Sequence, residues 1–161
     1  MDARIREYRP FDEEPVVELS LRAWAPVFDS MRSVLGDQLF LRLHGDWRTY
    51  QERAVRQVLS DGAMKVWVAA TEARVVGFAA ATVADPTGLL GEISMLAVDP
   101  NSQGSGVGGR LTEHATTWLR DAGMQVAMID TGGDAGHAPA RQVYEQADYT
   151  LMPIARYFKA L

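Results

Sequence analysis

The sequence predicts a mixed α/β fold in which helices cover a central sheet, and three observations lead to it. Strand and helix patterns follow each other in the order β, α, α, β, β, β, α, β, α, β. One segment, residues 107–122, has the apolar spacing of an amphipathic helix. The chain has 161 residues, 47% of them hydrophobic, which is enough for the core of a single domain over residues 1–161.

The first half of the chain opens with a strand and two helices. Residues 4–9 alternate as a strand that Pro10 ends. Asp12, two further acids and an early proline mark the start of a helix. We expect its buried stripe at Val16, Leu19, Ala23 and Val27. A second helix is expected over residues 38–59, with a break near Gly45.

The second half supplies most of the strands. Residues 65–70 and 75–83 form a hairpin, residues 92–98 a further strand, and Gly123 ends the long helix. Residues 124–129 are almost entirely apolar, which predicts a strand buried on both faces. A short helix over 139–147 follows, and residues 150–161 are expected to add one or two final strands.

Composition excludes several functions. The chain has no cysteine, so it cannot form disulfides, thiolate metal sites or a cysteine acyl-enzyme. A net charge of −5 without a basic cluster argues against nucleic acid as a partner. His44 and His114 lack partners at metal-ligand spacing, so no metal is expected. No apolar run reaches ~18 residues and the N-terminus is polar, which favours a cytoplasmic protein without a membrane span.

Glycines cluster where the long helix begins. Four of the 14 glycines lie between residues 104 and 109, after a strand that ends at Asp99-Pro100. Glycines let a ligand approach the backbone, and the free amides of a helix N-terminus favour phosphate. The glycine spacing also fits an NAD-binding dehydrogenase, with Asp130 on the ribose. Against that alternative, five residues separate strand and first glycine, and only about 50 residues remain for a doubly wound sheet.

Two motifs resemble those of the GNAT superfamily of N-acetyltransferases. The first is Gln103-x-x-Gly106-x-Gly108 after the strand that ends Leu96-Ala97-Val98. The second is His137-x-x-Ala140-x-x-x-Tyr144-Glu145, which is similar to a family pattern that begins with Asn. The resemblance implies a mostly antiparallel central sheet flanked by helices and acetyl-CoA as cosubstrate.

The resemblance also implies which residues hold the cosubstrate. The loop amides would bind the pyrophosphate, and the pantetheine arm would lie beside the strand, where the Leu96 amide would polarise the thioester carbonyl. The implied cofactor-binding residues are Leu96, Ala97, Val98, Gln103, Gly104, Ser105, Gly106, Val107, Gly108, Gly109, His137, Arg141 and Tyr144.

Transfer to an amine requires proton movement. An alkyl ammonium has a pKa near ~10.4 and must lose a proton before it attacks. By resemblance, Tyr144 is the acid near the sulfur and Glu92 is the candidate base. Strand alternation would place Glu92, Ser94, Leu96 and Val98 on one face. The alternatives are a packed tyrosine and a solvent-facing carboxylate.

Three positions need separate interpretation. His137 would cap the following helix, bind the cofactor or act on a proton, and capping is the expected role. Asp148 stands where the family has glycine, and aspartate tolerates the left-handed conformation needed there. Arg141 would reach a coenzyme phosphate or remain a solvated surface residue.

The acceptor is less defined by the sequence. By resemblance, Trp24, Phe28 and Asp29 are candidate substrate-binding residues. The expected partner is a small-molecule or peptide amine, acetylated by direct attack in a ternary complex, and a homodimer is possible. The second alternative to this function is a non-catalytic coenzyme A sensor.

Overall fold

The central layer is a five-stranded sheet with the strand order β1-β2-β3-β4-β5. The computed structural model describes residues 2–83 and 85–161. Neighbouring strands are antiparallel except the last pair, which is parallel. The strands are β1 (Arg4–Glu7), β2 (Lys65–Ala70), β3 (Val75–Thr82), β4 (Leu90–Val98) and β5 (Val126–Ile129).

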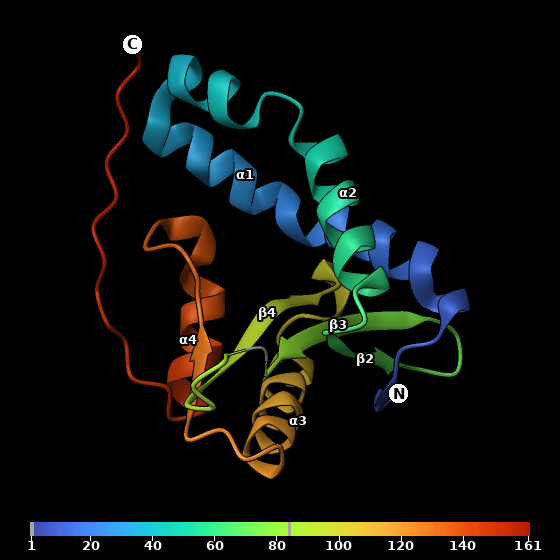
Figure 1. Cartoon of the computed structure of the whole chain (residues 1–161). Helices are drawn as coiled ribbons and strands as arrows, with labels where there is room; N and C mark the ends of the chain where they lie inside the picture. Colours follow the sequence, from blue (N-terminus) through green and yellow to red (C-terminus); the bar gives the residue numbers. More distant parts are fainter. Residues whose placement is uncertain (1, 84) are drawn as a thin grey trace.

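This topology confirms the predicted fold class, a mostly antiparallel sheet flanked by helices (Figure 1). It also shows that the NAD-binding alternative was wrong, because a dinucleotide-binding domain needs a doubly wound parallel sheet. The predicted hairpin is present as β2 and β3, joined through Thr71 and Arg74, whose backbone groups hydrogen-bond at 2.9 Å.

One face of the sheet is covered by α1 (Glu13–His44) and α2 (Trp47–Ser60). Val16, Leu19 and Val55 are fully buried there against Phe78 and its strand neighbours. The helical geometry of α1 breaks at Gly36, whose φ of 76° is positive, shortly before the predicted start of the second helix at residue 38. The break expected near Gly45 is present between α1 and α2. Within the described residues, no helix combines the length and apolarity needed to cross a membrane.

The other face is covered by α3 (Val107–Asp121), with α4 (Ala138–Gln146) beside it. The apolar stripe predicted for α3 is present, since Val107, Leu111 and Ala115 are at most 4% exposed. The described residues also include the single-turn helices η1 (Pro10–Asp12), η2 (Pro100–Ser102) and η3 (Ala135–His137).

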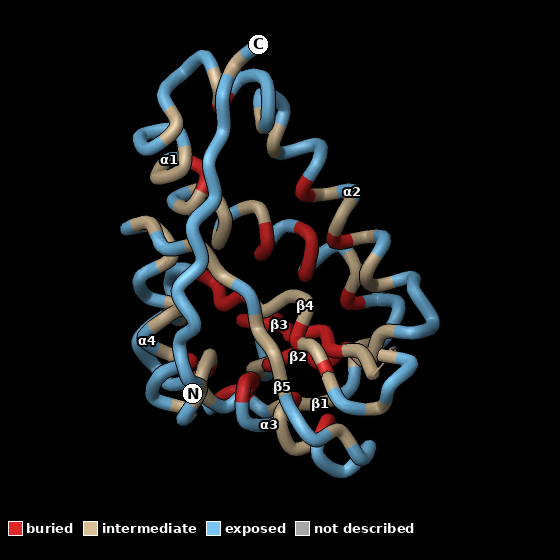
Figure 2. The backbone as a smooth tube through the Cα atoms, turned by 60° about the vertical axis from the view of Figure 1, so that its left-hand side comes forward, coloured by how far each residue is buried: buried red, intermediate tan, exposed pale blue. Residues whose placement is uncertain are grey.

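Two predictions for the C-terminal part were wrong. Strand β5 lies at the edge of the sheet and leaves Val126 48% exposed, so it is not buried on both faces. Residues 150–161 form no strand; this tail runs from the end of α4 toward α1, exposed along almost its whole length (Figure 2). The tail leaves β5 instead of pairing with it, so its apolar residues have no sheet to join.

Strand β4 contains a bulge that changes which residues share a face. Met95 lies opposite Ala80 and Ile93 opposite Ala81, so Ser94 has no partner on β3. Leu96 and Val98 therefore pack toward α3, whereas Met95 and Ala97 pack toward α1. Glu92 lies opposite Thr82 and belongs to the α1 face. The expectation that Glu92 and Leu96 share a face was wrong, because the bulge inserts one residue between them.

Candidate active site

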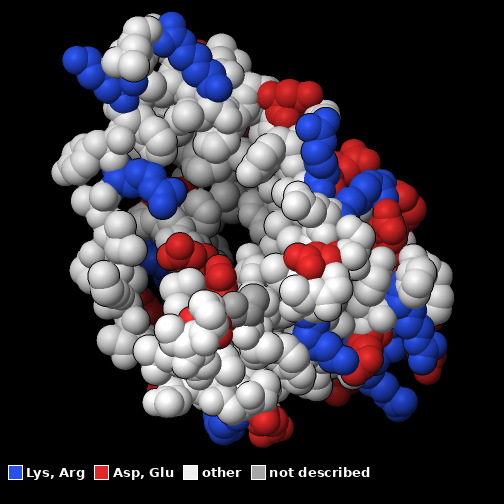
Figure 3. All heavy atoms as spheres, viewed as in Figure 1, with Lys and Arg blue, Asp and Glu red and all other residues white. Residues whose placement is uncertain are grey.

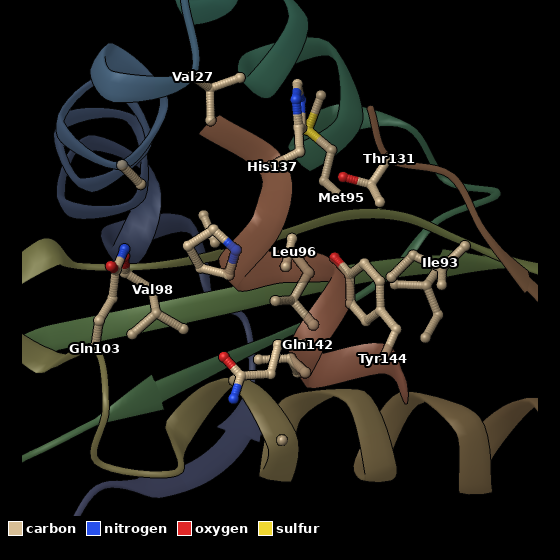
Figure 4. A pocket seen from close by; sticks show the side chains of 18 of the residues that line it. Val27, Ile93, Met95, Leu96, Val98, Gln103, Thr131, His137, Gln142 and Tyr144 are labelled. Atoms are coloured by element: carbon tan, nitrogen blue, oxygen red, sulfur yellow. The ribbon is translucent and has the colours of Figure 1, made fainter. Parts of the chain in front are cut away.

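A cavity of about 870 Å³ opens between α1, β4, the start of α3 and α4. The hollow is visible on the face shown in Figure 3, below helix α1. Its floor consists of residues 93–98 of β4, and Figure 4 shows Leu96, Gln103, His137 and Tyr144 around it. Two carboxylates, Glu113 and Asp130, are among its lining residues, which include no lysine or arginine.

The floor of the cavity is an open strand edge. Strand β5 pairs with β4 only over Leu90–Ile93, so among the described residues the β4 edge at 94–98 has no neighbouring strand on that side. Backbone amides and carbonyls at such an edge can pair with an extended ligand as though it were an added strand. The floor of the cavity is therefore suited to binding a long, amide-containing molecule.

The glycine loop borders the same cavity. Gly104 and Gly106 have φ of 76° and 80°, a conformation that side chains disfavour, and they bend the chain into α3. The first amides of α3 have no acceptor within the helix, so they are available to a phosphate. The predicted cofactor residues that line the cavity are Leu96, Ala97, Val98, Gln103, Gly104, Gly106, Gly108, Gly109, His137 and Tyr144.

Three predicted cofactor residues lie elsewhere. Val107 is 4% exposed and belongs to the core, and Ser105 lies outside the cavity lining. The Arg141 guanidinium donates hydrogen bonds to the backbone oxygens of Gly132, at 2.5 Å, and Asp134, at 2.8 Å. Arg141 therefore braces the loop between β5 and α4 in this structure.

An ion pair fixes the end of β4 just before the glycine loop. The fully buried Asp99 accepts a hydrogen bond from Arg22 of α1 at 2.8 Å and one from the Asn101 amide at 2.9 Å. Burial alone would raise the pKa of Asp99, but these hydrogen bonds outweigh it and hold the pKa below its ordinary value. Arg22 therefore links α1, which lines one side of the cavity, to the end of β4, which forms its floor.

Tyr144 of α4 projects into the cavity near Leu96 (Figure 4). It is 8% exposed, and burial, helped by Tyr149, raises its pKa to about 12. The hydroxyl therefore stays protonated at neutral pH and can donate a hydrogen bond to a group in the cavity. The role of Tyr144 as the acid stays a prediction, and the raised pKa favours hydrogen-bond donation over complete release of the proton.

Of the predicted base and the three predicted acceptor-binding residues, only one lines the cavity. Trp24 lines the cavity, whereas Phe28 is buried against Trp47, with ring centroids 4.4 Å apart. Asp29 is exposed on α1, and neither Phe28, Asp29 nor Glu92 is among the lining residues.

His137 does not have the expected capping role. It is the N-cap residue of α4, but its side chain makes no capping hydrogen bond and instead bonds to Asp134. Asp134 is in turn hydrogen-bonded to Ser30 of α1. Neither partner was predicted from the sequence. Asp134 is three residues before His137, a detectable spacing, but Ser30 is 104 residues from Asp134 and no sequence signal links them. Asp148 adopts the predicted left-handed conformation, with φ of 62°.

An open strand edge, a glycine loop at a helix start and a buried tyrosine surround one cavity, an arrangement suited to a long ligand that carries phosphate. The match to a family model makes this specific: the chain belongs to the Acetyltransferase (GNAT) family, whose model covers residues 28–149. This confirms the predicted family, and acetyl-CoA is the cosubstrate that membership implies.

Relatives in sequence are acetyltransferases. The chain is 28% identical, over 91% of its length, to mycothiol acetyltransferase of Saccharomonospora viridis. It is 39% identical, over 44% of its length, to the enzyme of the same name from Beutenbergia cavernae. The matches span 45% and 22% of these two relatives, so the chain corresponds to less than half of either.

Solved structures share the fold. An aminoglycoside 6'-N-acetyltransferase of Acinetobacter haemolyticus superposes with a TM-score of 0.68 and 14% identity, covering 98% of each chain. A GNAT family acetyltransferase of Brucella melitensis, solved with acetyl-CoA, gives a TM-score of 0.63 and 19% identity over 92% of this chain and 83% of its own. At these identities the likeness shows the fold alone.

Proposed function

We propose that this domain transfers an acetyl group from acetyl-CoA to a primary amine by direct attack in a ternary complex. The observation that carries the proposal is the open edge of β4 at residues 94–98, which lies between the glycine loop and Tyr144 in one cavity. The lack of cysteine favours direct transfer over a thiol acyl-enzyme.

In this mechanism the loop amides hold the pyrophosphate and the β4 edge aligns the pantetheine arm. The acceptor nitrogen, once deprotonated, attacks the thioester carbonyl, and the carbon–sulfur bond breaks to release a thiolate. A backbone amide, for which Leu96 is our candidate, stabilises the oxyanion. Tyr144 donates a hydrogen bond to the departing sulfur, and Glu92 is the base that the sequence suggests.

The acceptor class follows from charge. The cavity lining contains Glu113 and Asp130 and no lysine or arginine, which favours a cationic amine. Trp24 forms part of its wall. The names of similar proteins suggest two acceptor types to test, aminoglycosides and the acceptor of mycothiol acetyltransferase. The cytoplasmic location and a possible homodimer are part of this proposal.

The test measures thiol release from acetyl-CoA across a panel of amines that includes both types. Turnover on at least one amine, with N-acetylated product identified by mass spectrometry, supports the proposal. Tight coenzyme A binding with no turnover on any amine would favour the sensor function instead.

A further inference from the structure

Three polar side chains, of which His137 lines the cavity, form a hydrogen-bonded cluster that has no part in the mechanism proposed above. Ser30 Oγ donates a hydrogen bond to Asp134 Oδ2 at 2.5 Å, and Asp134 Oδ1 is bonded to His137 Nδ1. The Gly136 amide also donates to Ser30 Oγ, at 2.8 Å. The cluster therefore connects α1 to η3, whose last residue, His137, immediately precedes α4.

Two glycines leave the space that this cluster occupies. A Cβ at Gly132 would lie 2.5 Å from both Asp134 Oδ1 and His137 Nδ1. A Cβ at Gly136 would lie 2.5 Å from Ser30 Cβ. Neither glycine has a positive φ, so the absent side chain is what matters at both positions. The loop is thus shaped around the Ser30–Asp134–His137 contacts.

The contacts determine which nitrogen of His137 is available. Asp134 is 13% exposed, and although burial would raise its pKa, hydrogen bonds from Ser30 and His137 bring the pKa below its ordinary value. A carboxylate bonded to Nδ1 keeps the proton on that nitrogen and leaves Nε2 of a neutral imidazole as an acceptor. Within residues 2–83 and 85–161, the His137 side chain makes no other hydrogen bond.

The imidazole lies where an acceptor would enter. His137 lines the cavity with 18% of its side chain exposed. In Figure 4 it points toward the α1 side of the cavity, where Val27 lies, and away from Gln103 near the glycine loop. The thioester is expected beside β4, so an amine that enters from the α1 side would pass His137.

We propose that His137 is the catalytic base that takes a proton from the acceptor ammonium, with Asp134 and Ser30 as positioning residues. The proposal rests on the proposed acetyltransferase function and assigns its base to His137 in place of Glu92, which does not line the cavity. The ammonium N–H bond breaks and the proton moves to Nε2. The freed nitrogen electron pair forms the bond to the carbonyl carbon, and the carbon–sulfur electrons leave with the thiolate. The nitrogen, now positively charged, releases its second proton to the thiolate, which gives the neutral amide and the free thiol. The imidazolium then returns its proton to solvent.

Several charged groups surround this histidine. Asp134 contacts it directly, and Arg141 of α4 donates to the Asp134 backbone oxygen. The other titratable groups in the cavity lining are Glu113 of α3, Asp130 after β5, and Tyr144. From α1, Ser30 is the polar contact and the exposed Asp29 is its neighbour in sequence. Strand β4 contributes apolar Met95.

The test compares His137→Asn with His114→Asn, a matched change at an exposed α3 histidine that packs edge-on against Trp67 outside the cavity. Asparagine keeps hydrogen-bonding ability toward a bound cofactor but cannot accept the proton. We expect kcat of His137→Asn to fall by about 10²–10³-fold, with loss of the acid limb of the kcat–pH profile. The KM for acetyl-CoA and the Kd for coenzyme A should change by less than about threefold, and His114→Asn should behave as wild type.

Asp134→Asn provides a second variant that keeps the shape of the cluster. It should lower kcat by about tenfold or more without changing coenzyme A affinity, because the imidazole loses its fixed tautomer. Unchanged kcat in both variants, or a raised KM for acetyl-CoA with kcat retained, would overturn the proposal and make His137 a structural or cofactor-binding residue. A wild-type chain that turns over no amine would overturn the proposed function as well, so the two failures are distinguishable.

Discussion

At the scale of single residues, the Tyr144 hydroxyl has a defined chemical state. Its raised pKa of about 12 lies above the ~8.5 of an ordinary thiol, so complete proton transfer to the thiolate is unfavourable. A hydrogen bond to a charged group contributes about 1.5–3 kcal/mol. We therefore expect Tyr144→Phe to lower kcat by about 10–100-fold, measured as thiol release at saturating substrates.

The control for this variant is Tyr149→Phe. Tyr149 lies next to Tyr144, but its hydroxyl is paired with Thr116 Oγ1 at 2.6 Å and it does not line the cavity. This change should lower stability slightly and leave kcat near the wild-type value. Equal losses of kcat in both variants would show that Tyr144 acts through packing alone.

Asp99 should make stability depend on pH. Its pKa is lower in the folded state than in the unfolded chain, so the unfolded state binds more protons as pH falls. The stabilisation is fully present above the unfolded pKa of ~3.9 and disappears as pH drops through the folded value. Asp99→Asn should therefore reduce the melting temperature at pH 7, with the difference from wild type shrinking below about pH 4. Asp29→Asn, at an exposed carboxylate on α1, should change the melting temperature little at any pH.

At the scale of elements, the contact between β4 and α3 depends on a missing side chain. A Cβ at Gly91 would lie 2.5 Å from Leu119 Cδ2 and 2.9 Å from Met124 Cγ. Leu119 is 1% exposed and has little room to move. Gly91→Ala should lower the free energy of unfolding by about 1–3 kcal/mol in urea titrations. Gly62→Ala, where no atom lies within 4 Å of the added Cβ, is the control, and an equal effect there would contradict this account.

The sequence predicted elements whose signal is local. The apolar stripe of α3, the β2–β3 hairpin and the glycine loop each depend on spacing within about 20 residues, and each is present. The bulge at Ser94 and the Ser30–Asp134 hydrogen bond depend on contacts between distant segments, so no local pattern reveals them. The apolar composition of residues 150–161 predicted strands, but strand formation also requires a neighbouring strand to pair with. These residues run away from β5, the edge strand, and so do not pair with it.

At the scale of the whole molecule, the cavity depends on the two helical layers being held at a fixed separation. Helix α1 contacts the sheet through Val16 and Leu19 near its start, and Arg22 joins it to Asp99. The next turns of α1 diverge from the sheet and provide Trp24 and Val27 to the cavity wall. The cavity therefore lies where α1 leaves the core, and the Ser30–Asp134 hydrogen bond connects α1 to the loop before α4.

The tail over residues 151–161 contributes apolar surface without a core. Its large apolar side chains are 45% exposed or more: Leu151, Met152, Ile154, Tyr157, Phe158 and Leu161. An interaction that fixes its end is a hydrogen bond from Arg42 to the Leu161 oxygen at 3.3 Å. Exposed apolar residues of this kind favour association between copies of the protein. The open edge of β5 in one copy is available to pair with the tail of another.

Removal of residues 151–161 should consequently leave the fold intact. Because these side chains are exposed, we expect the free energy of unfolding to change by less than about 1 kcal/mol in urea titrations. Any association between copies should weaken, which sedimentation velocity at several concentrations would measure. The double variant Ile154→Ser/Tyr157→Ser, with residues 151–161 retained, is the matched test, since it removes apolar surface but keeps the backbone. A large loss of stability in either variant would mean that the tail packs against the domain in solution. Unchanged association would show that the tail is not the surface through which copies associate.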